Sequence, residues 1–367
     1  MKKRALTCLI LILLALAACQ PVAQPAPTQT FAAPTQTSPA ATDTTSSLST
    51  PTATAAILAT TAVPEPTLPL DQALEGTLAR RYLQALSEDI GARVAGTPAE
   101  EQAADYIAGV FSDLGYTPQR QSFDFVPEDT ADPTDSALRS QNIIAVKTGQ
   151  SEKEIIVGAH YDSVDAGRGA DDNASGIAVV LEVAERLVDV ETPYTIRFVA
   201  FGAEEVGLKG STYYAGQMSQ DEIRNTLFMV NLDSLAAGDN LYVYGDVGEK
   251  GVVRNWVLTY ANQNHLPIQT QKGQHPDYPI GTTGDWSDHA PFKAAGIQYV
   301  YFEATNWTLG NLDGYTQVDP QFGENGEIWH TAYDDIAYIT ETFPGRLDSH
   351  LQVFTHMLFH VLTDYKL

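Results

Sequence analysis

Cysteine is almost absent from this sequence of 367 residues. The only two, Cys8 and Cys19, lie within the first nineteen residues. The rest of the chain can therefore form neither a disulfide bond nor a thiolate metal site. Any metal ligands that it offers must be imidazole nitrogens and carboxylate oxygens.

Basic residues are scarce as well, with 21 Lys and Arg against 46 Asp and Glu, so the formal net charge is -25 at pH 7. Nucleic acids and anionic lipid surfaces are bound by clustered Lys and Arg. We therefore expect no nucleic-acid partner, and some of the acidic residues are available for a functional site.

The chain opens like an export signal, with three basic residues followed by an apolar run at 6–15. This run is shorter than the roughly 20 apolar residues that span a bilayer. It ends in the letters LAAC, which resemble the lipobox of bacterial lipoproteins and make Cys19 the acylated residue. We predict a lipoprotein-type signal peptide at 1–19 and an exported protein, lipid-anchored to the membrane surface in the cell envelope. An ordinary cleaved signal peptide or an uncleaved anchor is the alternative.

Residues 20–69 contain mainly Ala, Thr, Pro and Ser, with almost no large apolar side chains. Such a segment cannot bury enough apolar surface to offset the entropy lost on ordering. We predict a disordered tether here, which holds a folded domain at 70–367 away from the membrane.

Within 70–367, runs rich in Ile, Val, Phe and Tyr alternate with segments that carry apolar residues at helical spacing. The predicted strands lie at 142–149, 154–162, 194–205, 226–233, 240–245 and 297–304. The predicted helices lie at 77–91, 100–115, 174–188, 211–223, 249–262, 289–295 and 340–365. The central strands are apolar at consecutive positions, which is typical of strands covered on both faces. This order predicts an α/β fold, a single three-layer α/β/α sandwich with a mostly parallel central sheet.

Acidic and His residues recur where the predicted strands give way to loops. They are His160 and Asp162, Asp172, Glu204 and Glu205, Asp233, and His330. Ligands of open α/β sheets bind outside the carboxyl ends of the strands, so these side chains are expected to meet. Imidazole and carboxylate groups in this number are typical of a metal hydrolase.

In order and spacing these residues resemble the M28 family of zinc aminopeptidases, over essentially all of residues 75–365. The shared pattern is a His-x-Asp, an Asp-Asn before a small-residue helix start, a Glu-Glu pair, a later Asp and a C-terminal His-Thr. The resemblance implies two Zn²⁺ ions, with Co²⁺ or Mn²⁺ as substitutes. It implies metal ligands at His160, Asp172, Glu205, Asp233 and His330, with Asp172 shared by both ions. It also implies that Glu204 is the general base and that Asp162 orients His160.

Two assignments stay open in this pattern. Asp171 is adjacent to Asp172 and could be the shared carboxylate in its place. Trp329 precedes His330, where several M28 aminopeptidases have a Tyr that donates to the oxyanion. An indole N–H is also a donor, but Tyr278 or Tyr301 could supply the bond instead.

The remaining motifs give weaker indications of function than the metal-site pattern does. His356 and His360 are four residues apart, but Met357 stands between them where a zincin motif requires Glu. The segment Ser287-Asp288-His289 suggests either groups near the substrate or a helix cap, and no G-x-S-x-G elbow accompanies it. Residues 306–328 are expected to form a loop over the pocket whose acidic side chains hold a substrate ammonium group, or a plain surface loop.

The primary prediction is a zinc-dependent aminopeptidase that hydrolyses N-terminal residues from peptides, with Glu204 as base. A glutaminyl-peptide cyclase is the first alternative, because such enzymes share this fold and the Trp-His-Thr sequence and use a single zinc. A lipoprotein that only binds peptides is the second, although none of the expected metal ligands is missing.

Overall fold

An eight-stranded mixed sheet runs through the part of the chain that the computed structural model describes, residues 75–126 and 137–367. The predicted signal peptide at 1–19 and the tether at 20–69 lie outside these residues. In sheet order the strands are β1 (Gln119–Phe125), β2 (Leu138–Lys147), β4 (Tyr194–Phe201), β3 (Ser151–His160), β5 (Thr226–Leu232), β8 (Tyr299–Thr305), β6 (Asn240–Gly245) and β7 (Ile268–Gln269).

The four central strands β4, β3, β5 and β8 are parallel, so their carboxyl ends lie at one edge of the sheet. Antiparallel pairs flank them, with β2 between β1 and β4 on one side and β6 next to β8 on the other. The predicted α/β fold with a mostly parallel sheet is confirmed. The prediction missed β1, whose residues are mostly polar and exposed, and β7, which has only two residues.

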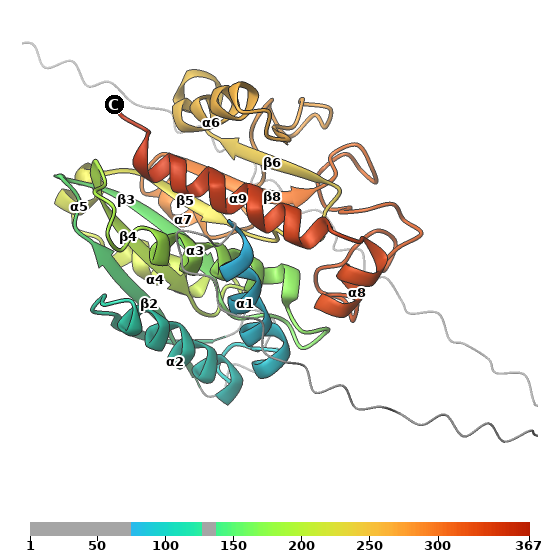
Figure 1. The fold of residues 1–367 in the computed structure, drawn as a ribbon, viewed down its shortest axis with the longest axis horizontal. Helices are drawn as coiled ribbons and strands as arrows, with labels where there is room; N and C mark the ends of the chain where they lie inside the picture. The colour runs from blue at the N-terminus through green and yellow to red at the C-terminus, as the bar shows by residue number, and fades with distance from the viewer. Residues whose placement is uncertain (1–74, 127–136) are drawn as a thin grey trace, which may run out of the picture. The chain divides into compact units, whose positions relative to one another are not determined.

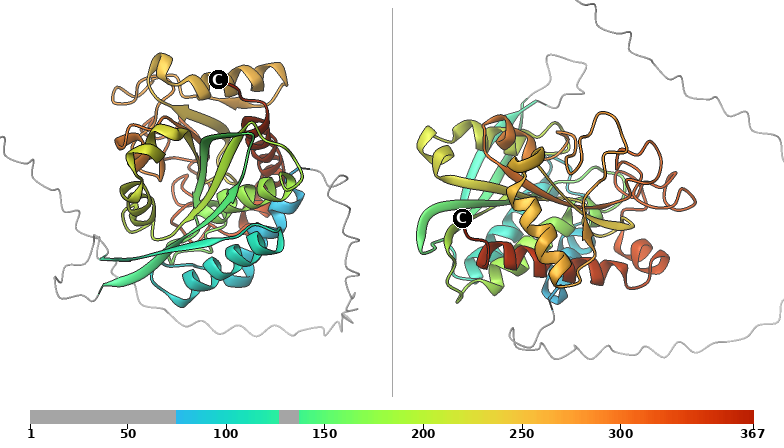
Figure 2. Two further views of the ribbon diagram at one scale, coloured as in Figure 1. Left: turned by 90° about the vertical axis from the view of Figure 1, so that its left-hand side faces the viewer. Right: turned by 90° about the horizontal axis from the view of Figure 1, so that it is seen from above.

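Helices cover both faces of this sheet, as Figures 1 and 2 show. On one face lie α1 (Thr77–Gln84), α2 (Pro98–Asp113), α3 (Ser175–Arg186), α6 (Val252–Gln263) and α9 (Arg346–Thr363). On the other face lie α4 (Lys209–Gln217), α5 (Gln220–Asn225) and α7 (His289–Ala294). The remaining helix, α8 (Ile336–Thr342), precedes α9.

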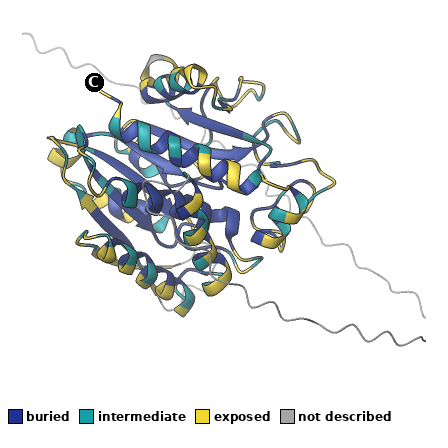
Figure 3. Ribbon diagram, in the orientation of Figure 1, coloured by how far each residue is buried: buried dark blue, intermediate teal, exposed yellow. Residues whose placement is uncertain are grey.

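Each face of the sheet has its own apolar core. On β3, Ile155 and Val157 belong to the core under α3 and α9, whereas Ile156 between them belongs to the core under α4 and α7. All three are fully buried, and Figure 3 shows this burial throughout the central strands. Burying each such side chain contributes about 1.5–3 kcal/mol, so the sheet is a rigid support for groups at its edge.

Two predicted helices are each broken in two. The segment at 340–365 is interrupted by Pro344 and by Gly345, whose φ is 78° and which precedes the first residue of α9. The segment at 211–223 ends at Met218 and restarts after Ser219, which forms a capping box with Glu222. Among the helices of residues 75–126 and 137–367, none is long and apolar enough to cross a membrane.

Candidate metal centre

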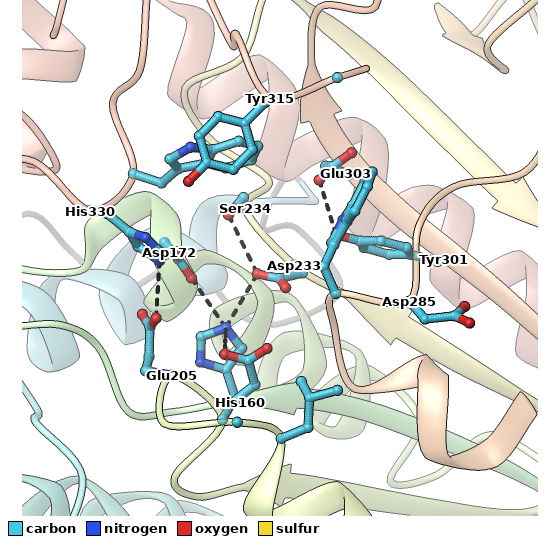
Figure 4. A pocket seen from close by; sticks show the side chains of 16 residues that line it. His160, Asp172, Glu205, Asp233, Ser234, Asp285, Tyr301, Glu303, Tyr315 and His330 are labelled. Carbon is cyan, nitrogen blue, oxygen red and sulfur yellow. Dashed lines mark hydrogen bonds and ion pairs between the residues drawn. The ribbon is translucent and has the colours of Figure 1, made fainter. Parts of the chain in front are cut away.

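The polar residues singled out at the strand ends meet around one pocket of about 350 Å³. His160 is the last residue of β3 and pairs in register with Phe201, the last residue of β4. Glu204 and Glu205 follow β4 by a few residues, and Asp233 directly follows β5. Figure 4 shows the side chains of His160, Asp172, Glu205, Asp233 and His330 pointing toward one another in this pocket. The parallel order of β4, β3 and β5 is therefore what brings them together.

His160 lies at the centre of one group of ligands. Its Nε2 atom is 3.1 Å from Asp172 Oδ1, 3.3 Å from Asp233 Oδ1 and 3.9 Å from Glu204 Oε2. Its side chain is 1% exposed. One imidazole and several carboxylates in this arrangement could hold a metal ion.

His330 forms the second group from the opposite side of the pocket. Its Nε2 atom is 3.0 Å from Asp172 Oδ2 and 2.9 Å from Glu205 Oε2. Asp172 thus places one carboxylate oxygen beside each His, as a carboxylate shared by two ions would. Glu204 pairs with His160, and Glu205 pairs with His330, although a Glu205 oxygen also lies within 4.8 Å of a His160 nitrogen.

The charges of the pocket shift the pKa values of its members strongly. Burial alone would lower the pKa of His160, but Glu204 and Asp233 raise it well above its ordinary value. Hydrogen bonds to Asp172 and Glu205 raise the pKa of His330 to about 12. Burial raises the pKa of Glu205 to about 7, and Asp172 beside it adds to that effect. The clustered carboxylates are therefore stabilised by positive charge, which protons on the two His residues or a bound cation can supply.

Asp162 lies behind this pocket and contacts both the Glu pair and His160. Its two side-chain oxygens accept the backbone N–H groups of Glu204 (3.0 Å) and Glu205 (3.1 Å). Nδ1 of His160 is 3.2 Å from the Asp162 backbone oxygen and 3.6 Å from its carboxylate. Asp162 thus fixes the turn after β4 and faces the ring nitrogen of His160 that points away from the pocket.

Asp171, the alternative to Asp172, points away from the two His residues. Its Oδ1 accepts the N–H groups of Ala236 (2.6 Å) and Ala237 (2.9 Å), and its Oδ2 accepts the side-chain amide of Gln317 (2.5 Å). Burial raises its pKa to about 7, although these donors oppose the shift. The geometry therefore favours Asp172 over Asp171 as the shared carboxylate.

Two further residues near the pocket, Asp334 and Gln317, were not predicted from sequence, and a third, Ser287, was named only as part of the segment 287–289. Asp334 accepts the backbone N–H groups of Asp171 (2.6 Å) and Asp172 (3.1 Å). Ser287 donates to Asp233 Oδ2 at 2.6 Å. Gln317 accepts the N–H groups of Ile328 and Trp329 and so fixes the segment before His330. The repeated acids in "YDD" and the "SDH" segment were the only sequence signals for them.

Three of the weaker candidates, His356, His360 and His289, do not line the pocket. His356 and His360 are on α9, where their Nδ1 atoms pair with Glu75 (2.8 Å) and Asp364 (2.7 Å). His289 is buried between the rings of Tyr299 and Tyr301 at 4.6 and 5.0 Å, and burial lowers its pKa to about 3.

Asp288 does not line the pocket either, but it lies close enough to interact with the charge of His160. It is fully buried and both carboxylate oxygens lack a hydrogen-bond partner among the described residues. Burial raises its pKa to about 7, and the charge of His160 opposes that shift.

Comparisons with known proteins identify the family of this chain. The model of peptidase family M28 matches residues 142–354. The alkaline phosphatase isozyme conversion protein of Escherichia coli is 36% identical over 281 residues, which are 70% of this chain and 81% of that protein. Aminopeptidase YwaD of Bacillus subtilis is 35% identical over 209 residues, 55% of this chain and 41% of that protein. The probable lipoprotein aminopeptidase LpqL of Mycobacterium tuberculosis is 32% identical over 182 residues, which are 48% of this chain and 32% of that protein.

Solved structures show the same fold in two enzyme classes. A zinc aminopeptidase from Bacillus subtilis superimposes with a TM-score of 0.63 at 22% identity, covering 80% of this chain and 96% of that one. The glutaminyl cyclase of Porphyromonas gingivalis superimposes with a TM-score of 0.62 at 21% identity, and the match covers 79% of this chain and 98% of that one. The fold is common to both classes, whereas the family match is to a peptidase family and several of the sequence relatives are named aminopeptidases. The chain therefore belongs to peptidase family M28 and is a peptide hydrolase of the aminopeptidase type.

Proposed function

We propose that this protein is an exported, two-zinc aminopeptidase that releases N-terminal residues from peptides. The observation that carries the proposal is the position of Asp172, whose two oxygens lie 3.1 and 3.0 Å from the Nε2 atoms of His160 and His330. A carboxylate placed between two imidazoles is the arrangement that holds two ions about 3.5–4 Å apart in two-metal hydrolases.

The residues present fit such a metal pair. Oε1 of Glu205 is buried without a hydrogen-bond partner among the described residues, which is costly unless a cation takes that place. His160 and Asp233 would complete one site, and Glu205 and His330 the other. Bound zinc lowers the pKa of a coordinated water toward 7 and polarises the carbonyl of the scissile bond. Mixed His and carboxylate sites also accept Co²⁺ and Mn²⁺.

Glu204 is the proposed general base. It lines the pocket, is 9% exposed, and burial raises its pKa well above its ordinary value, with Asp288 and Glu205 adding to the effect and His160 opposing it. A carboxylate of raised pKa is a better proton acceptor, so Glu204 can take a proton from the attacking water and pass it to the leaving amine. Asp162 supports this role by holding the backbone N–H of Glu204.

The pocket can accommodate the N-terminal residue of a peptide substrate. Its carboxylates can hold a free α-amine, and Leu208, Trp286 and Trp329 supply apolar walls for the first side chain. The proposed site of action is the cell envelope, with a lipid on Cys19 as the anchor to the membrane. The similarity to LpqL, named as a lipoprotein aminopeptidase, supports this location.

A glutaminyl-peptide cyclase is the second candidate. The Trp-His-Thr sequence at 329–331 and the shared fold favour it. A protein that only binds peptides is not favoured, because all five proposed ligands lie within the pocket.

One assay separates these functions. The purified protein is incubated with an aminoacyl-anilide and with a peptide that begins with Gln, each with and without a chelator. The proposal expects metal-dependent anilide cleavage and release of free Gln. Loss of ammonia without residue release would establish cyclisation instead, and binding without any turnover would establish a binding protein.

A further inference from the structure

A buried arginine, Arg93, contacts the loops behind the proposed metal centre without lining the pocket. It belongs to the loop between the one-turn helix Ala85–Ile90 and α2, and it is fully buried. Removing a charged guanidinium from water is costly unless its N–H groups and its charge find partners in the protein. The identity of these partners therefore indicates what the residue does.

The guanidinium of Arg93 binds main-chain carbonyl oxygens from three segments of the chain. These oxygens belong to Tyr161 (2.6 Å from Nε), Arg168 (2.9 Å from Nη1), Gly169 (2.8 Å from Nη2), Gly91 (2.9 Å from Nη1) and Leu86 (3.3 Å from Nη1). Arginine suits such a set of acceptors, because its N–H groups form a rigid planar fork. The side chain thus ties its own loop to the segments that contain Tyr161 and Gly169.

These two segments carry proposed metal ligands. Tyr161 directly follows His160 at the end of β3, and Gly169 lies three residues before Asp172. One guanidinium therefore connects the backbones from which His160 and Asp172 extend. Because His160 Nε2 and Asp172 Oδ1 lie 3.1 Å apart, a shift of either segment would change the spacing of the ligands.

Arg93 is itself held by its backbone and by close packing. Its N–H donates to Ser163 Oγ at 3.0 Å, and its carbonyl oxygen accepts the Ser163 N–H at 3.2 Å. Gly169 has a φ of 58°, and a Cβ atom there would lie 2.7 Å from Nη2 of Arg93. Glycine at this position therefore lets the loop lie directly on the guanidinium.

The charge of Arg93 acts on the metal centre in the opposite direction to its hydrogen bonds. Burial lowers its pKa to about 10, so the side chain stays charged at neutral pH, and nearby carboxylates oppose the shift. These carboxylates are Asp334, Asp162, Asp172 and Glu205. Because like charges repel, this cation opposes the binding of metal ions nearby. The geometry that its hydrogen bonds fix favours metal binding, so the two effects can be separated by experiment.

We propose that Arg93 is a positioning residue that holds the segments of His160 and Asp172 at the spacing for zinc binding before any metal is present. This inference rests on the proposed two-zinc function. Groups that orient metal ligands from outside the coordination sphere typically contribute about 10–100-fold to metal affinity. A site that is already ordered also loses less conformational entropy when its ligand binds.

Arg93→Lys tests this role, because lysine keeps the positive charge but lacks the planar fork of donors. Zinc affinity is measured on metal-free protein by competition with a chromophoric chelator, and Arg93→Lys should weaken it about 10–100-fold. Arg254→Lys is the matched control. Arg254 is 5% exposed and donates to the main-chain oxygens of Asp246 and Gly281 (both 2.8 Å), but it does not line the pocket. Its zinc affinity should stay at the wild-type value.

Urea unfolding of the metal-free proteins separates positioning from a purely structural role. Both substitutions leave buried carbonyl oxygens with fewer donors, so both should lower the urea concentration at the midpoint of unfolding. Only Arg93→Lys should also weaken zinc binding. Wild-type or tighter zinc binding in Arg93→Lys, or equal weakening in Arg254→Lys, overturns the inference.

Hydrogen exchange of the wild-type protein decides the question if Arg93→Lys does not fold. Mass spectrometry follows exchange in the segment 161–172 with and without zinc. We expect this segment to be protected from exchange in metal-free protein, because Arg93 holds it without metal. Protection that appears only when zinc is added overturns the inference and leaves the two-zinc function standing. A wild-type protein that binds no zinc overturns both.

Discussion

Two sets of buried acidic residues lie within one region of this molecule and differ in what they contact. The pocket carboxylates are Asp172, Glu204, Glu205 and Asp233, and their nearest polar contacts include the imidazoles of His160 and His330. The supporting carboxylates are Asp162, Asp171 and Asp334, and each accepts two backbone N–H groups. Backbone donors satisfy the second set, whereas the first set faces the two imidazoles and is the set proposed to bind cations.

The adjacent residues Asp171 and Asp172 show that partners, and not residue type or sequence position, decide these roles. Asp171 is saturated by Ala236, Ala237 and Gln317, so it fixes the loop after β5. Asp172 pairs with the two His side chains and is held by Asp334 through its own backbone N–H. Replacing a pocket carboxylate should therefore impair metal binding or hydrolysis, whereas replacing a supporting carboxylate should mainly lower stability.

The largest effect is expected for Asp172→Ala. This change removes the carboxylate proposed to be shared by both ions, so metal binding should be lost and hydrolysis should fall at least about a thousandfold, to the level of the chelated protein. Metal content is measured by mass spectrometry next to anilide hydrolysis. Asp165→Ala, at an exposed position of the same loop, is the control. Two bound ions in Asp172→Ala would contradict the shared role.

Glu204→Gln should separate proton transfer from metal binding within the pocket set. The amide keeps the shape of the side chain but cannot accept the water proton, so kcat should fall by about 10²–10⁴-fold while the metals stay bound. Glu205→Ala, next to it, should lose metal instead. Full activity in metal-loaded Glu204→Gln protein would refute the assignment of the base.

Asp171→Ala should affect stability more than metal binding. It leaves the N–H groups of Ala236 and Ala237 without an acceptor in a buried region, which costs about 1–3 kcal/mol. Urea unfolding of chelated protein measures this loss, and metal analysis checks that binding persists. If Asp172→Ala destabilised the chelated protein as much as Asp171→Ala, the distinction between the two sets would fail.

The smallest effect concerns Glu303, whose oxygens accept the hydroxyls of Tyr244 and Tyr301. Burial raises its pKa from 4.5 to about 8, so between these values the folded state holds a proton that the unfolded state has released. The free energy of unfolding should therefore decrease as the pH rises from about 5 to about 8. Glu303→Gln should flatten this slope in chelated protein, whereas exposed Glu101→Gln should leave it unchanged. An unchanged slope in Glu303→Gln would refute the raised pKa.

The sheet and the pocket set could be predicted from sequence because each depends on local patterns. Consecutive apolar residues predicted central strands such as 154–162, and polar residues at strand ends predicted where their side chains would meet. The supporting contacts could not be predicted in the same way. Asp334 lies 163 residues from the Asp171 N–H that it accepts, and Gln317 lies 146 residues from the Asp171 carboxylate. Only the folded chain brings such partners together.

The donors suggested for the carbonyl oxygen also depended on contacts that the sequence does not show. The Tyr301 hydroxyl donates to Glu303 Oε1 at 3.0 Å, and Tyr278 does not line the pocket. Neither contact follows a sequence motif.

The number of metal ions bound per chain tests the central claim most directly. Purified protein is loaded with zinc, dialysed and analysed for metal and protein concentration, with hydrolysis measured on the same sample. The account predicts two ions per chain, with hydrolysis lost when a chelator removes them and restored when zinc is returned. One ion or none per chain in a fully active sample would contradict it.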